Sequence, residues 1–127
     1  MSPRALAKRR LRGFALSTLA LCIALPQPAA AEVRCGWLVH PTPGNLWLKD
    51  DRGDWLISTQ GGPYAEGVER LPEPTPGQFV KSNGDYGYSC ACVQGAFDAK
   101  TTSVTRIDAA RALPLSVCYR NDKLPRP

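Results

Sequence analysis

Four cysteines constrain the fold of this chain more than any other feature: Cys35, Cys90, Cys92 and Cys118 all lie beyond residue 31. An even number of cysteines in a short exported chain predicts two disulfides. A bond between Cys90 and Cys92 is disfavoured, because side chains two residues apart on a strand share a face but cannot be joined without backbone strain. Two pairings remain open, and both tie Cys35 and Cys118 to the strand that carries Cys90 and Cys92.

The N-terminal segment indicates that the chain is exported. Residues 4–12 are rich in Arg and Lys and contain no acid, residues 14–25 form a largely apolar run, and residues 29–31 are alanines. This order is typical of a cleavable signal peptide and places the cleavage directly after Ala31. The apolar run is too short for a membrane-spanning helix, which needs roughly 20 apolar residues. We therefore expect a periplasmic or secreted protein with no stable membrane anchor after cleavage.

Removal of residues 1–31 leaves residues 32–127, which we expect to form a single small β domain without net charge. This part contains eleven basic and eleven acidic residues, because the excess of Lys and Arg lies in the predicted signal peptide. It has no cluster of Lys or Arg, so we expect no nucleic-acid partner. A domain of this size buries only roughly 60–65% of its unfolded surface, so cross-links are expected to contribute much of its stability.

Short apolar stretches separated by Gly, Pro and Asp predict a mainly β fold. The stretches that we expect to form strands are residues 37–40, 46–49, 55–58, 78–81, 86–97 and 103–107. The second and third form a hairpin, and the last returns antiparallel to residues 86–97 with a bulge. Residues 59–77 are expected to be a long loop, and residues 108–113 a helical turn that ends at Pro114. We predict a small antiparallel sheet of five or six strands, barrel- or sandwich-like and stapled by two disulfides, with at most a short helix near residues 108–118.

Several segments resemble a family of small exported bacterial proteins that is classed only as a domain of unknown function. In chain order, the matching segments are Cys35-Gly36-Trp37, Pro41-Thr42-Pro43 with Trp47-Leu48 following, Gln60-Gly61-Gly62, Gly84-Asp85-Tyr86-Gly87-Tyr88-Ser89-Cys90-Ala91-Cys92, and Leu113-Pro114-Leu115 leading to Cys118. The family often has Gly at the position of Ser89, a change between small residues. The resemblance implies bacterial origin and export, and it implies no activity, cofactor or site.

Any histidine-dependent chemistry depends on His40, the only histidine. A Ser-His-Asp arrangement would combine it with Ser58 or Ser89 and an aspartate of residues 50–54, but neither serine lies in a nucleophile-elbow sequence. A thiol-metal site would use His40 with the Cys90 and Cys92 thiols, which an oxidising compartment disfavours. An envelope hydrolase and a thiol- or histidine-based metal-handling protein remain alternatives, while we expect no catalytic residue, metal or cofactor.

The leading hypothesis is a non-enzymatic binding or interaction module of the bacterial envelope, inhibitor-like in character. Aromatic side chains stack on sugars or bury in protein partners, and the Gly- and Pro-rich loop of residues 59–77 is long for so small a domain. The candidate contact residues are Trp47, Trp55, Gln60 and Tyr64. The expected partner is an envelope protein or a glycan.

Overall fold

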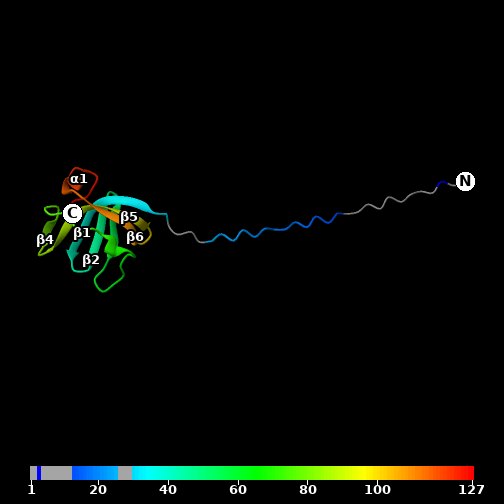
Figure 1. Cartoon of the computed structure of the whole chain (residues 1–127), viewed down its shortest axis with the longest axis horizontal. Coiled ribbons are helices and arrows are strands. Elements are labelled where there is room, and N and C mark those ends of the chain that lie inside the picture. The colour runs from blue at the N-terminus through cyan, green and yellow to red at the C-terminus, as the bar shows by residue number, and fades with distance from the viewer. Residues whose placement is uncertain (1–2, 4–12, 26–29) are drawn as a thin grey trace.

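The computed structural model describes residues 3, 13–25 and 30–127. Figure 1 shows a small β domain followed by one short helix. In chain order, its elements are β1 (Glu32–Thr42), β2 (Asn45–Asp50), β3 (Gly53–Ser58), the 3-10 turn η1 (Val68–Arg70), β4 (Val80–Asn83), β5 (Tyr86–Asp98), β6 (Ser103–Leu113) and α1 (Leu115–Tyr119). The prediction of a mainly β domain is confirmed.

Residues 13–25 precede this domain and form neither helix nor strand. Figure 1 shows them as an extended segment that leads away from the domain, and their large apolar side chains are exposed, Phe14 to 93%. Part of the predicted signal peptide, residues 1–2, 4–12 and 26–29, lies outside the described residues. Within the described ranges, no helix is both long and apolar enough to cross a membrane.

The sheet closes on itself into a barrel. Its strand order is β1-β2-β3-β6-β5-β4, and β1 also pairs with β5, so that five strands form a ring and β4 lies beside β5 outside it. The pairings are antiparallel except that of β3 with β6, which is parallel. A three-stranded meander followed by a hairpin that closes against its first and third strands is the connectivity of OB-fold barrels. The expected barrel-like sheet is thus present, with one parallel contact that the sequence did not predict.

A short piece of the predicted long loop completes the barrel wall between β3 and β6. The backbone N–H of Ala65 donates to Ile57 O on β3 at 2.8 Å, and the N–H of Ile107 on β6 donates to Glu66 O at 2.7 Å. β3 and β6 are directly paired only at Leu56 and Ser103. The loop backbone therefore satisfies strand groups that would otherwise be left without partners at this seam.

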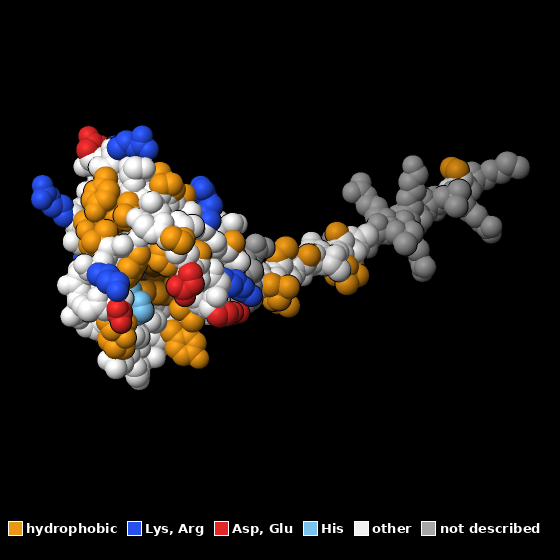
Figure 2. All heavy atoms as spheres, turned by 60° about the vertical axis from the view of Figure 1, so that its left-hand side comes forward, with side chains coloured by type: hydrophobic (Ala, Val, Ile, Leu, Met, Phe, Trp, Pro, Cys, Tyr) orange, Lys and Arg blue, Asp and Glu red, His pale blue; other side chains and the backbone are white. Residues whose placement is uncertain are grey.

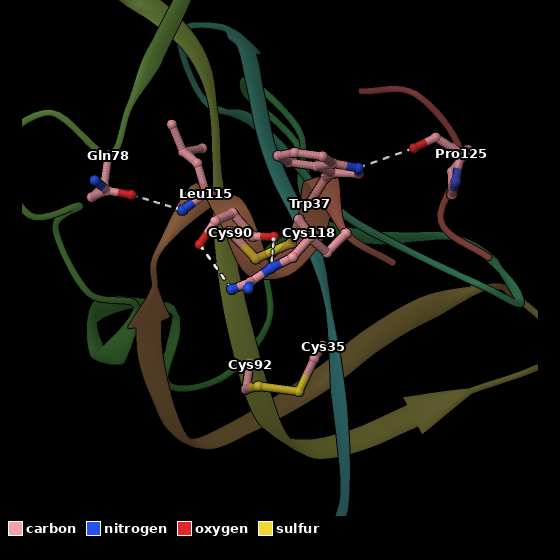
Figure 3. Close-up of a disulfide and its surroundings, with 10 residues drawn as sticks. Cys35, Trp37, Gln78, Cys90, Cys92, Leu115, Cys118 and Pro125 are labelled. Atoms are coloured by element: carbon pink, nitrogen blue, oxygen red, sulfur yellow. Dashed lines mark hydrogen bonds between the residues drawn. A yellow bond between two sulfur atoms is a disulfide. The ribbon is translucent and has the colours of Figure 1, made fainter. Parts of the chain in front are cut away.

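Because successive side chains of a strand point to opposite faces of the sheet, the apolar residues form two separate clusters. The cluster inside the barrel consists of Leu38, Leu48, Trp55, Ile57, Ala65, Ala91, Val93, Val104 and Ile107. The second lies on the opposite face of the sheet, where Trp37 and Cys90 pack with Cys118 of α1. Trp37 Nε1 also donates to Pro125 O at 3.0 Å, which fastens the C-terminal segment to this face (Figure 3).

Two disulfides, Cys35–Cys92 and Cys90–Cys118, link both ends of the domain to β5. Cys35 and Cys92 are direct cross-strand partners on β1 and β5, whereas Cys118 brings α1 onto the outer face. Figure 3 shows the two bonds one after the other along β5. The predicted scaffold is confirmed, and the structure selects one of the two pairings left open. Disulfides of this kind are typical of proteins outside the cytoplasm.

The predicted helical turn at residues 108–113 is wrong, because this stretch continues β6. Ala109 to Leu113 pair in register with Gln94 to Cys90 of β5. Pairing along β5 overrides the helix propensity of the alanines, which is weak in so short a stretch. Pro114 does not end a helix but immediately precedes α1, where its fixed φ and missing N–H are tolerated.

Other strand boundaries also differ from the prediction, most of all those of β1. This strand begins at Glu32 rather than at residue 37 and continues through Pro41 to Thr42 instead of stopping at His40. The proline is accommodated because the β1–β2 register shifts between Val39 and Thr42, so no regular ladder bond is required from it. The fourth strand is Val80–Asn83 rather than residues 78–81.

Candidate functional site

One end of the barrel is filled by a charged and aromatic plug. Asp50 is only 3% exposed, and its Oδ1 accepts hydrogen bonds from the backbone N–H of Arg52 at 2.8 Å and Gly53 at 3.1 Å and from Trp55 Nε1 at 3.0 Å. Arg34 Nη1 lies 2.9 Å from Asp50 Oδ2, and its guanidinium stacks over the Trp55 ring at 4.3 Å. Most polar groups at this end are bonded to one another, although Arg34 Nε is buried without a hydrogen-bond partner among the described residues, and the hollow beside them, about 220 Å³, is smaller than the one at the other end.

The hydrogen bonds of the plug keep Asp50 ionised. Burial alone would raise the pKa of Asp50, but the bonds from Arg52 N–H, Arg34 and Trp55, together with the charge of Arg34, hold the pKa below its ordinary value. The carboxylate is therefore a structural group, matched to a fixed set of donors.

The other end of the barrel opens into a groove of about 690 Å³, which we call the barrel-end groove. Figure 2 looks onto this face and shows hydrophobic, acidic and basic side chains gathered around the histidine side chain, which is drawn in pale blue. The groove is lined by Leu38, His40, Gly44, Leu46, Ser58, Val68, Glu69, Leu71, Pro72, Glu73, Pro74, Phe79, Lys81, Asp85 and Ser89. Its volume lies within the range of about 300–1,000 Å³ that is usual for ligand sites.

Neighbouring strands β1 and β5 supply polar groups to the groove. Ser89 of β5 stands opposite Leu38 of β1, and His40 lies two residues further along β1, on the same face as Leu38. The His40 ring packs edge-on against Tyr86 with centroids 5.1 Å apart. A side chain at Gly87 would overlap the backbone of Val80 on β4, so the glycine allows β4 to approach β5 beside the groove.

Ser89 presents to the groove a hydroxyl that has no partner within the described fold. It is 6% exposed, and its hydroxyl makes no hydrogen bond to any other residue that the structure describes. Ser89 lines the open groove, and among the described residues the buried side-chain atom without a hydrogen-bond partner is Arg34 Nε at the other end of the barrel. The Ser89 oxygen is therefore within reach of a molecule in the groove.

The predicted long loop forms the wall of the groove opposite the strands. After η1 the loop runs through Leu71, Pro72 and Pro74, and Phe79, which lies between the loop and β4, extends the same wall; the prolines restrict the conformation of this stretch. Arg70 Nη1 donates to Ile107 O at 2.8 Å, which anchors the start of this wall to β6. The wall is thus fixed to the barrel at its base.

The four predicted contact residues do not form one surface. Trp55 belongs to the plug at the opposite end, and Trp47 lies half-buried on β2, next in sequence to the inward-facing Leu46 and Leu48. Gln60 and Tyr64, the latter 71% exposed, line a separate hollow of about 440 Å³. This hollow adjoins the barrel-end groove, because both are lined by Gly44, Ser58 and Val68.

The structure brings together only some of the residues of the predicted hydrolase alternative. His40, Ser58 and Ser89 all line the groove, but within the described part of the chain His40 has no hydrogen bond to either serine, and the Ser58 hydroxyl donates to Gly44 O at 2.6 Å. No aspartate of residues 50–54 lines the groove. The structure therefore does not bring these residues together as a hydrogen-bonded Ser-His-Asp arrangement.

The thiol groups of the predicted metal alternative are used in disulfides. Among the described residues no three His, Cys, Asp or Glu side chains are grouped closely enough to hold a metal ion.

Sequence reasoning missed most of the groove. The residues it did not select as binding residues include Glu69, Glu73, Phe79, Lys81 and Asp85. The usable signals were the Gly- and Pro-rich composition of residues 59–77 and the same-face spacing of Leu38 and His40 on a strand. Neither signal reveals which end of a barrel stays open.

Comparison with known proteins identifies a family but no activity. Residues 29–125 match the family described as "Protein of unknown function (DUF4087)". No curated protein and no solved structure matches this chain significantly.

Proposed function

The chain belongs to DUF4087, a family of proteins of unknown function, and from its groove we propose that it is a non-enzymatic binding module of the bacterial envelope. The ligand lies in the barrel-end groove between β1, β5 and the wall of residues 68–79. The ligand is presented by an envelope protein or a glycan, and the bound module acts in an inhibitor-like manner by covering it.

The proposed location outside the cytoplasm rests on two features. The two disulfides are typical of an oxidising compartment, and residues 4–31 have the order of charges, apolar residues and alanines of a signal peptide. Export to the periplasm or the medium with cleavage after Ala31 accounts for both. N-terminal sequencing of the exported protein tests the cleavage site directly.

The observation that carries the binding function is a groove of about 690 Å³ in which Ser89 presents a hydroxyl that has no hydrogen-bond partner among the described residues. Apolar walls with a few convergent polar groups are the usual composition of a ligand site.

The binding function is tested by nuclear magnetic resonance on the ¹⁵N-labelled, oxidised protein, titrated with a panel of short peptides and oligosaccharides. We expect shift changes to concentrate on Leu38, Leu71 and Ser89. Changes confined to Gln60 and Tyr64, or no changes with any member of the panel, would contradict the proposal.

A matched pair of variants separates the groove from the rest of the surface. Ser89→Leu places an apolar side chain in the groove and is expected to abolish binding. Ser116→Leu makes the same change at an exposed position of α1 and is expected to leave binding unchanged. Equal loss in both variants would argue against the groove.

A further inference from the structure

The charges around the barrel-end groove do not balance. Three carboxylates line it, those of Glu69, Glu73 and Asp85, against one ammonium group, that of Lys81. Lys81 Nζ lies 3.0 Å from Asp85 Oδ1, so the only lysine of the groove is already paired. Glu69 and Glu73 form no ion pair with another described residue. The carboxylates of Glu69 and Glu73 therefore line the groove without a cationic partner among the described residues.

The basic residue nearest to them in sequence does not neutralise the groove. Arg70 lies next to Glu69, but its Nη1 donates to Ile107 O at 2.8 Å, on β6. It is not one of the residues that line the groove. The guanidinium group of Arg70 therefore binds to β6, while the carboxylates of Glu69 and Glu73 remain at the groove.

Apolar side chains line the groove together with these carboxylates. Leu71, Pro72, Pro74 and Phe79 line the wall, and the floor carries the unpaired Ser89 hydroxyl. A complementary ligand has an apolar body along the wall, a cationic group at the two carboxylates and a polar atom that can bond to Ser89.

We infer that the barrel-end groove selects organic cations, that is, ligands that carry an ammonium or guanidinium group on an apolar chain. This inference rests on the proposed binding function and names its ligand class. The same chemistry is offered by a free alkylamine and by a lysine or arginine side chain of a polypeptide.

Three probes with the same chain length test the ligand class: n-octylammonium, n-octanol and octanoate, titrated at low salt and followed by shift changes at Leu71 and Ser89. We expect n-octylammonium to bind most tightly and octanoate most weakly. The preference should shrink at 1 M salt, where the Debye length falls to about 3 Å. If octanol or octanoate binds the groove as tightly as the ammonium, the ligand class is wrong and the binding function stands. If the peptides and oligosaccharides of the earlier panel and all three probes leave the groove residues unperturbed, the binding function itself fails.

Charge-removal variants assign the preference to the two glutamates. Glu69→Gln with Glu73→Gln is expected to weaken n-octylammonium binding about 2- to 30-fold at low salt, since each exposed ion pair contributes about 0.2–1 kcal/mol. Asp51→Asn with Asp122→Asn removes the same charge at exposed positions away from the groove and is expected to change binding less than twofold. An equal loss in the two double variants would overturn the inference, because it would show an effect of net charge alone.

A blocked apolar hexapeptide with one central lysine, compared with its Nε-acetylated form, distinguishes the two sources of the cation. Tighter binding of the lysine peptide than of n-octylammonium assigns the groove to a polypeptide side chain, and the reverse order assigns it to a free amine. Equal binding of the lysine and acetyl-lysine peptides would contradict selection for a cation.

Discussion

Cys35 and Cys92 face each other across β1 and β5 and are joined by a disulfide, although Cys35 is exposed and Cys92 is buried. Both cysteines of the second disulfide are buried, since Cys90 is 0% and Cys118 3% exposed. The two bonds therefore have different accessibility on the same strand. Thiol-disulfide exchange requires access of the attacking thiolate to a sulfur atom.

Limited reduction should accordingly open Cys35–Cys92 before Cys90–Cys118. The measurement is brief treatment with dithiothreitol, alkylation of the freed thiols and peptide mapping by mass spectrometry. We expect Cys35 and Cys92 to be alkylated first. Earlier alkylation of Cys118 would show that α1 does not protect the second bond.

Replacement of the buried carboxylate in Asp50→Asn should lower the free energy of unfolding by about 3 kcal/mol, because the largely buried Arg34 charge then keeps only the half-exposed Glu32 as an ion-pair partner among the described residues. The matched variant Asp54→Asn, which breaks the exposed pair with Lys49 at 3.4 Å, should cost less than about 1 kcal/mol. Urea unfolding at neutral pH measures both. Similar losses would mean that the plug contributes no more than a surface ion pair.

Asp50 also predicts a pH dependence of stability. Its pKa in the folded protein lies below the ordinary value of 3.8, so the unfolded chain binds its proton more readily than the folded one. The stabilisation is present above pH 3.8 and is lost as the pH falls through the lower folded pKa. Acid titration of stability should show a shallower decline in Asp50→Asn than in the parent protein. An identical decline in both would contradict the assignment.

Gly67 should tolerate no side chain, because its φ is +79° and a Cβ there would overlap Ile107 O. Gly77 has the same φ of +79°, but nothing lies within 4 Å of a Cβ placed there. We expect Gly77→Ala to cost about 1 kcal/mol, the conformational penalty alone, and Gly67→Ala clearly more. Thermal unfolding of the two variants isolates the steric contact. Equal losses would show that residues 64–67 are not packed against β6.

The sequence was sufficient for the features that depend on local pattern. The hairpin of β2 and β3 follows from two apolar stretches around Asp50 to Asp54, and β5 from its long run of apolar and aromatic residues. The linkage of Cys35 and Cys118 to β5 follows from cysteine number and spacing. The choice between the two pairings needs the β1–β5 register, which places Cys35 opposite Cys92.

The features that the sequence did not reveal depend on contacts between distant segments. Residues 108–113 are a strand because β5 provides their partner, and residues 64–66 act as a strand because β3 and β6 diverge around them. The groove arises because Asp50 and Arg34 fill one end of the barrel while Ser89 and Leu38 leave the other open. These outcomes depend on which side chains meet across the barrel, and local composition does not encode that.

The most direct test of the barrel-end groove compares the unfolding of Ser89→Ala with that of Ser58→Ala in urea. Ser58 donates a hydrogen bond to Gly44 O at 2.6 Å, so its loss should lower the free energy of unfolding by about 0.5–1.5 kcal/mol. Ser89 has no partner within the described fold, so Ser89→Ala should leave stability unchanged or raise it, while weakening the binding of the groove ligand. A loss of stability in Ser89→Ala as large as that in Ser58→Ala would show that the hydroxyl serves the fold, and would contradict its assignment to a ligand.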